Sequence, residues 1–173
     1  MKRNVAFLGV FLALALVLSY VETFIPFFFG VPGMKLGLTN LIIVILLYCM
    51  GAKEAYLISI VRVFLAGFLF GNLFSIVYSL AGALLSLTVM MILVKRTGLK
   101  TVTVSAVGGI CHNIGQLIVA AIVVESYNIF YYLPALLISG LVTGLLIGIV
   151  SQALIPRIRR FFRKDRQEEK RTD

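Results

Sequence analysis

The segment LFSIVYSLAGALLSLTVMMILV (residues 73–94) decides the fold class of this chain. No charged side chain interrupts it, and Lys95 and Arg96 follow it directly. About 20 consecutive apolar residues are enough for an α-helix to cross the hydrocarbon core of a bilayer. The segment therefore predicts a transmembrane helix that ends at a basic membrane surface.

Similar apolar runs recur on both sides of this segment. The chain has 173 residues, of which 61% are hydrophobic and 13% charged, a balance far too apolar for a soluble domain. Breaks between the runs predict six spans, at residues 4–25, 37–52, 54–71, 73–94, 102–124 and 130–155. We expect an all-α membrane protein with a six-transmembrane-helix bundle over residues 1–156 and a basic tail over residues 157–173. The first run lacks the cleavage site of a signal peptide, so we expect it to be retained.

The distribution of Lys and Arg predicts the topology. The connections that share one side contain Lys2, Arg3, Lys53, Lys95, Arg96, Lys100 and the tail, whereas the other connections contain Glu22, Lys35, Asn72 and Glu125. Basic residues favour the cytoplasmic side, so we expect a multi-pass protein of the cell membrane with both termini in the cytoplasm. The tail holds much of the net charge of +9, which favours anionic lipid headgroups as a partner and not nucleic acid.

Small residues recur at helical spacing in four spans. They are Ala6, Gly9 and Ala13; Ala55, Ser59 and Ala66; Ser75, Ser79, Gly82 and Ser86; and Gly140, Gly144 and Gly148. In lipid, such stripes let two helix backbones approach closely. Each stripe is compatible with packing inside the bundle or with docking of another membrane protein.

Arg62 lies about midway along the third span. A cation at that depth costs about 2.5–3.5 kcal/mol on insertion scales unless it meets a counter-ion or water. Glu22 and Glu125 fall near the outer edge and Glu54 begins the span on the cytoplasmic side, so we expect no carboxylate at the depth of Arg62.

The segment GGICHNIGQLIVAA (residues 108–121) places three polar residues at the same depth as Arg62. His112 and Asn113 lie about one helical turn before Gln116, so the three side chains project toward one sector. One interpretation is that they tie helices together. The other is a polar cavity shared with Arg62, which we favour.

The first outer connection, FIPFFFGVPGMKLGLTN (residues 24–40), is rich in Pro, Gly and Phe. Irregular backbone is tolerated at a membrane edge where protein or water covers it, so this segment is a candidate lid. An interfacial aromatic belt is the alternative. The candidate substrate-binding residues are Lys35, Asn40, Arg62, His112, Asn113 and Gln116.

No catalytic or metal-binding motif is present in the sequence. It has no GxxxxGK[ST], HExxH or GxSxG pattern, and its Asp residues, Asp165 and Asp173, both lie in the tail. Cys49 and Cys111 stand far apart inside apolar runs, which is typical of packing residues. We therefore expect no enzyme activity, cofactor or metal site in this chain.

Several segments together resemble a known family. PGMKLGLTN, LISIVRVFLAGFLFGN, YSLAGALLSL, GGICHNIGQLIVAA and YYLPALLISGLVTGLL are similar, in order and spacing, to the Gx transporter family, whose members are also labelled heptaprenyl diphosphate synthase component I. This family is grouped with the substrate-binding S components of energy-coupling factor (ECF) transporters. The resemblance implies a six-helix bundle with a ligand site under the first outer loop.

The resemblance also implies partners. In S components, small residues on the first helix, commonly AxxxA, dock a transmembrane coupling subunit that works with ATPase subunits. The corresponding residues here are Ala6, Gly9 and Ala13, and only Gly9 and Ala13 keep the four-residue spacing. The function implied is capture of a small polar or anionic molecule for uptake. The other family label implies a non-catalytic membrane component of a polyprenyl diphosphate synthase, with an isoprenoid or quinone precursor as the related chemistry.

Overall fold

The computed structural model of the chain is all-helical. It describes residues 2–24, 37–125 and 127–172, with the backbone alone for residues 2–4, 127 and 164–172. The elements are α1 (Lys2–Phe24), α2 (Leu38–Cys49), α3 (Ala52–Phe70), α4 (Leu73–Arg96), α5 (Thr101–Val124), the short 3₁₀-helix η1 (Tyr127–Tyr132) and α6 (Leu133–Thr172). The described residues contain no strand. The predicted fold class, a helical membrane bundle, is confirmed.

Four of the described helical segments are long and apolar enough to cross a membrane: Val5–Phe24, Leu73–Arg96, Thr101–Val124 and Asn128–Arg163. The other two predicted spans are less regular. The α2 helix is apolar but has only 12 residues, about 18 Å at 1.5 Å per residue. The α3 helix has 19 residues and carries Lys53, Glu54 and Arg62. The chain is a multi-pass membrane protein in which α2 and α3 depart from simple membrane-spanning geometry.

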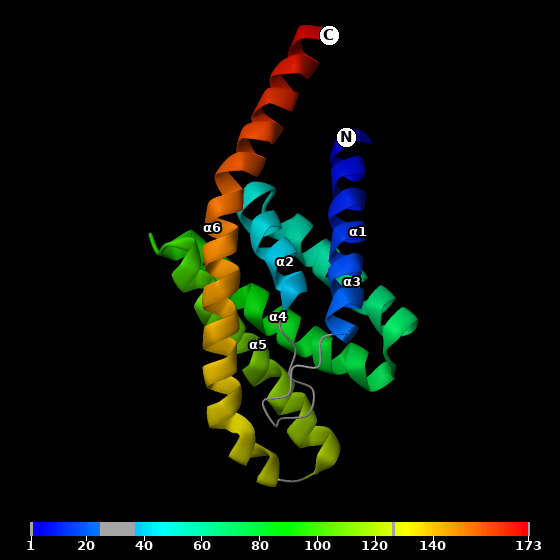
Figure 1. Cartoon of the computed structure of the whole chain (residues 1–173), viewed down its shortest axis with the longest axis vertical. Helices are drawn as coiled ribbons and strands as arrows, with labels where there is room; N and C mark the ends of the chain where they lie inside the picture. Colours follow the sequence, from blue (N-terminus) through cyan, green and yellow to red (C-terminus); the bar gives the residue numbers. More distant parts are fainter. Residues whose placement is uncertain (1, 25–36, 126, 173) are drawn as a thin grey trace.

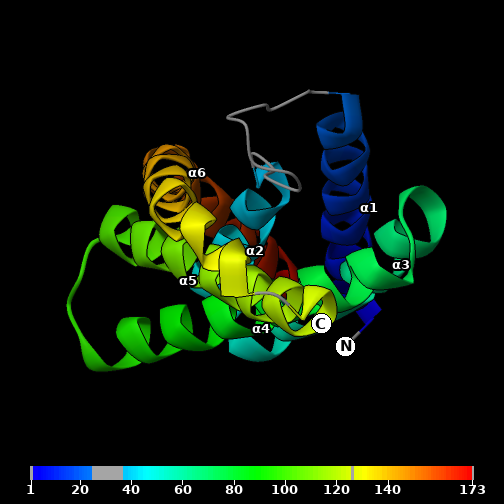
Figure 2. The same ribbon diagram turned by 90° about the horizontal axis from the view of Figure 1, so that it is seen from below.

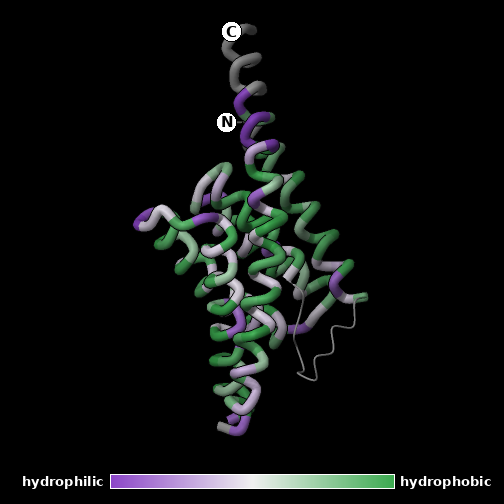
Figure 3. Tube along the Cα trace, turned by 60° about the vertical axis from the view of Figure 1, so that its left-hand side comes forward, coloured by the Kyte–Doolittle hydropathy of each residue, from purple (hydrophilic) through white to green (hydrophobic). Residues whose placement is uncertain are grey.

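The last helix runs further than the predicted span of residues 130–155. The α6 helix has 40 residues and continues through Pro156 to Thr172. Residues 157–172 are mostly Arg, Lys, Glu and Gln, which favour helix even where no core is available. In Figure 1 this part of α6 extends beyond the bundle, and Figure 3 shows that it becomes hydrophilic there.

Both termini lie at one end of the molecule, which we call the terminal end (Figure 1). Viewed along the long axis, α2 lies between α1 and α6 (Figure 2). Residues 42–47 of α2 are all buried, and all of them except Ile45 belong to the main hydrophobic core. At the terminal end of α2, the Arg159 guanidinium on α6 donates a hydrogen bond through Nε to the Tyr48 carbonyl oxygen at 3.1 Å. The short α2 is thus enclosed by other helices and does not contact lipid along most of its length.

Glycines set the spacing of α4, α5 and α6. A Cβ atom on Gly115 of α5 would lie 2.8 Å from the Ala81 carbonyl oxygen of α4, and one on Gly140 of α6 would lie 2.7 Å from the Gly109 carbonyl oxygen of α5. Side chains do not fit at such distances, so these backbones are in direct contact. The stripes on α4 and α6 therefore pack inside the bundle.

The stripe on α1 differs from the others. Ala6, Gly9 and Ala13 are all exposed, and a Cβ atom on Gly9 would meet no described atom within 4 Å. These three residues therefore make no close helix contact within the described part of the chain. Docking of a partner at this face remains a prediction.

Candidate functional site

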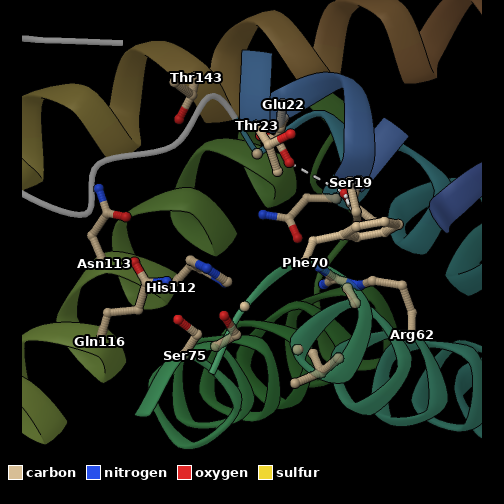
Figure 4. Close-up of a pocket in the computed structure, with 18 of the residues that line it drawn as sticks. Ser19, Glu22, Thr23, Arg62, Phe70, Ser75, His112, Asn113, Gln116 and Thr143 are labelled. Carbon is tan, nitrogen blue, oxygen red and sulfur yellow. Dashed lines mark hydrogen bonds between the residues drawn. The ribbon is translucent and has the colours of Figure 1, made fainter. Parts of the chain in front are cut away.

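A polar cavity of about 90 Å³ lies where the ends of α1 and α2 meet the other helices, away from the terminal end (Figure 4). Every one of the six α-helices contributes a polar side chain to its wall. These residues are Ser19, Glu22 and Thr23 of α1; Thr39 and Asn40 of α2; Arg62 of α3; Ser75 and Ser79 of α4; His112, Asn113 and Gln116 of α5; and Thr143 of α6. Such convergence is typical of a ligand site in a helical bundle.

Five of the six candidate residues from the sequence line this one cavity. They are Asn40, Arg62, His112, Asn113 and Gln116. The sixth, Lys35, and most of the candidate lid fall in residues 25–36, outside the described residues. The structure thus brings the described candidates together, while their role in binding a substrate stays a prediction.

Arg62 is the cation of the cavity. Its Nε is buried and donates to no acceptor among the described residues. The guanidinium enters the cavity from the side opposite His112 (Figure 4). Because an arginine has five N–H donors and is always charged, this group provides a strong site for an acceptor or an anion.

The expectation that Arg62 has no carboxylate at its depth is wrong. Glu22 lines the same cavity and attracts Arg62 electrostatically. The physical reason is that α1 packs along α3, so the far end of α1 lies beside the cavity. Counting residues along each span places a side chain on its own helix, but it does not show which helix ends pack together.

Glu22 also binds the first turn of α2. Its Oε1 accepts a hydrogen bond from the Leu38 backbone N–H at 2.9 Å, and its Oε2 accepts one from the Thr39 hydroxyl at 3.3 Å. Gly37, which precedes the helix, has a φ of 70° and provides no side-chain cap. Ser19, one turn earlier on α1, shares a 3.0 Å hydrogen bond with the Thr39 hydroxyl. The end of α1 therefore caps the N-terminus of α2. In other helices, this role usually belongs to the side chain of the N-cap residue itself.

Of the three polar residues on α5, Asn113 ties two helices together. Its Nδ2 donates to the Leu136 carbonyl oxygen at 2.7 Å and to the Ser139 hydroxyl at 3.1 Å, both on α6. The interpretation that these polar residues tie helices together therefore holds for the Nδ2 atom of Asn113. Asn113 also lines the cavity.

Gly82 of α4 positions the other two residues. A Cβ atom at this site would lie 2.8 Å from Gln116 Cγ, 2.8 Å from the His112 carbonyl oxygen and 3.1 Å from His112 Cε1. The absence of a side chain at position 82 lets α5 approach α4 closely. Gln116, which is buried, and His112 are thereby held at the cavity wall.

The size and chemistry of the cavity limit what it can enclose. A volume of about 90 Å³ holds several water molecules or a small polar group. Pockets that enclose drug-sized ligands measure roughly 300–1,000 Å³. Among the described residues, no group of three His, Cys, Asp or Glu could hold a metal ion. The arrangement suits binding through hydrogen bonds and charge.

The fold and the cavity together define a multi-pass helical membrane protein with a buried polar site. The family model described as heptaprenyl diphosphate synthase component I matches residues 11–154, which is most of the chain. The chain therefore belongs to that family, in agreement with the resemblance seen in the sequence. No curated protein and no solved structure matches it.

Proposed function

We propose that this chain is the substrate-binding membrane subunit of an uptake system and captures a small polar or anionic molecule in the cavity. The observation that carries this proposal is the buried Arg62 Nε, which finds no acceptor among the described residues, in a cavity lined by polar groups from six helices. A buried donor without a partner is unfavourable by about 1–3 kcal/mol, which a ligand acceptor would offset. The resemblance to ECF S components suggests a transmembrane coupling subunit with ATPase subunits as the partner.

A second candidate function is that of a non-catalytic membrane component of a heptaprenyl diphosphate synthase. The family description favours it by name, and the name implies an assembly of several subunits. The part of α6 beyond the bundle carries exposed Arg157, Arg160 and Arg163. In this second function these groups hold anionic lipid headgroups near the bilayer or bind a soluble catalytic chain.

The partner distinguishes the two functions. The chain is tagged in its native host, extracted in a mild detergent, and the copurified proteins are identified by mass spectrometry. Copurified ATPase and coupling subunits support uptake, and a soluble prenyltransferase chain supports the second function.

The ligand tests the cavity directly. Small molecules are released from the purified protein by denaturation and identified by mass spectrometry for the wild type, for Arg62→Leu and for a control variant, Arg96→Leu. Arg96 is exposed at the end of α4 and does not line the cavity. We expect one polar compound to be enriched with the wild type and the control and to be lost with Arg62→Leu. Equal recovery from all three proteins would refute a ligand site at Arg62.

A further inference from the structure

The cavity contains a place that is built for an anion and is filled by the protein itself. The N-terminus of α2 opens into it, where the Leu38 N–H and the Thr39 hydroxyl both donate to Glu22. An unsatisfied helix N-terminus attracts negative charge through its free N–H groups and the helix dipole. Two donors on two carboxylate oxygens match a planar, two-oxygen anionic group.

Arg62 gives a second indication of an anion in this cavity. Its Nε is buried at the cavity without any acceptor among the described residues, although Glu22 attracts it electrostatically. Glu22 uses one hydrogen bond from each of its oxygens for α2 and forms none with Arg62. The cavity therefore contains more donors than the Glu22 carboxylate satisfies.

We infer that Glu22 occupies the anion subsite of the ligand-free cavity, and that the carboxylate group of the ligand replaces it between the α2 N-terminus and Arg62. This inference rests on the proposed ligand-binding function and adds the chemical class of the ligand, a small carboxylate. It also gives Glu22 a role that the sequence did not suggest, as an internal competitor of the ligand.

The helix that carries Glu22 can yield more readily than its neighbours. Only 6% of the apolar window of α1 is buried, against 22–33% in the other three long apolar helices. Its far end is held to α2 by the two hydrogen bonds of Glu22 and by the Ser19–Thr39 hydrogen bond. A ligand carboxylate that replaced Glu22 would remove two of these three ties. Ligand binding would thereby loosen the far end of α1. The exposed stripe of small residues lies on the same helix, toward its other end.

Chemical rescue of Glu22→Ala tests the subsite with acetate as the probe. The variant leaves the donors of α2 and Arg62 without a carboxylate, so added acetate should bind there. We expect the apparent Tm of the purified variant to rise with acetate concentration and to saturate, by about 3–6 °C at ten times the apparent Kd. Chloride at matched ionic strength should leave the Tm unchanged. The wild type, whose subsite is filled, should respond much less.

Two further variants locate the effect. Glu54→Ala removes a carboxylate from the first turn of α3, outside the cavity, and should gain nothing from acetate. Glu22→Ala combined with Arg62→Leu should lose the rescue, because the cation of the subsite is gone. Rescue by phosphate but not by acetate, or rescue that persists without Arg62, would overturn the assignment of a carboxylate subsite.

If Glu22→Ala does not fold, the acetate experiment uses Glu22→Gln in its place. The neutral amide keeps the shape of the side chain but is a weaker competitor, so acetate should raise the Tm of this variant more than that of the wild type. An equal response of the two proteins would reject the inference. Failure of the rescue together with recovery of a ligand from the wild type would reject the carboxylate subsite alone. Successful rescue with no ligand recovered from any protein would instead reject the proposed function.

Discussion

Replacing Arg62 with Leu tests whether the Arg62 side chain binds a ligand or holds the helices together. If Arg62 serves a ligand, only the attraction to Glu22 offsets its desolvation penalty in the empty protein. The Arg62 Nε donates to none of the described residues, so its removal leaves no acceptor unsatisfied there. We therefore expect the empty Arg62→Leu protein to be as stable as the wild type or more stable.

The magnitude follows from two opposing terms. On insertion scales, Arg at the centre of a helix is less favourable than Leu by about 3–4 kcal/mol. Against this stands the lost attraction to Glu22, which is below about 4 kcal/mol for charges more than about 4 Å apart at an effective dielectric constant of about 20. Glu22 keeps its hydrogen bonds from Leu38 and Thr39, so it does not become an unpaired buried charge. The net expectation lies between a loss of about 1 kcal/mol and a gain of about 4 kcal/mol in the stability of the variant.

Thermal unfolding in detergent measures this difference. For a chain of this length, 1 kcal/mol shifts the Tm by about 2–4 °C, so the expected shift lies between about 4 °C downward and about 16 °C upward. Arg96→Leu is the matched control and should change stability by no more than about 0.5 kcal/mol. A loss of more than about 1 kcal/mol in Arg62→Leu, with the control unchanged, would show that the guanidinium holds the helices together and would refute the reasoning.

Three further predictions concern packing, docking and topology. Gly82→Ala should destabilise the protein by about 1–3 kcal/mol, because its Cβ would lie 2.8 Å from Gln116 Cγ; an unchanged Tm would contradict the close approach of α4 and α5. Gly9→Leu should leave the Tm of the isolated protein within the range of a surface change, since no described atom lies within 4 Å of a Cβ atom at this position, and should reduce copurification of a membrane partner. A lower Tm without any partner would instead assign this face to internal packing. A single cysteine at position 98, with both native cysteines replaced, should resist an impermeant thiol reagent in intact cells, and labelling from outside would overturn cytoplasmic termini.

The helical membrane class could be predicted because hydropathy alone determines it. The segment of residues 73–94 coincides almost completely with α4, whose first turn is fixed by the Asn72 side chain accepting from the Ser75 N–H at 2.8 Å. The cavity residues of α5 could be predicted because helical spacing places His112 and Gln116 on one face. The continuation of α6 could not be predicted from apolar runs, since charged residues extend a helix through propensity and not through hydropathy.

Four cavity residues that the sequence analysis did not select share one feature, which is their place beside the short apolar run of α2. Ser19, Glu22 and Thr23 lie about one turn apart at the end of α1, and Thr39 lies in the first turn of α2. From the sequence, Glu22 is placed near the outer edge because each span is treated as a full crossing, and the edge is where polar residues ordinarily lie. The 12-residue α2 invalidates that assumption, because a helix of about 18 Å cannot connect both surfaces of a core about 30 Å thick. One end of such a helix must lie below the surface, and its free N–H groups then require a partner at that depth. Polar residues that flank an unusually short apolar run are therefore candidates for a buried site, and here that rule would have identified Glu22.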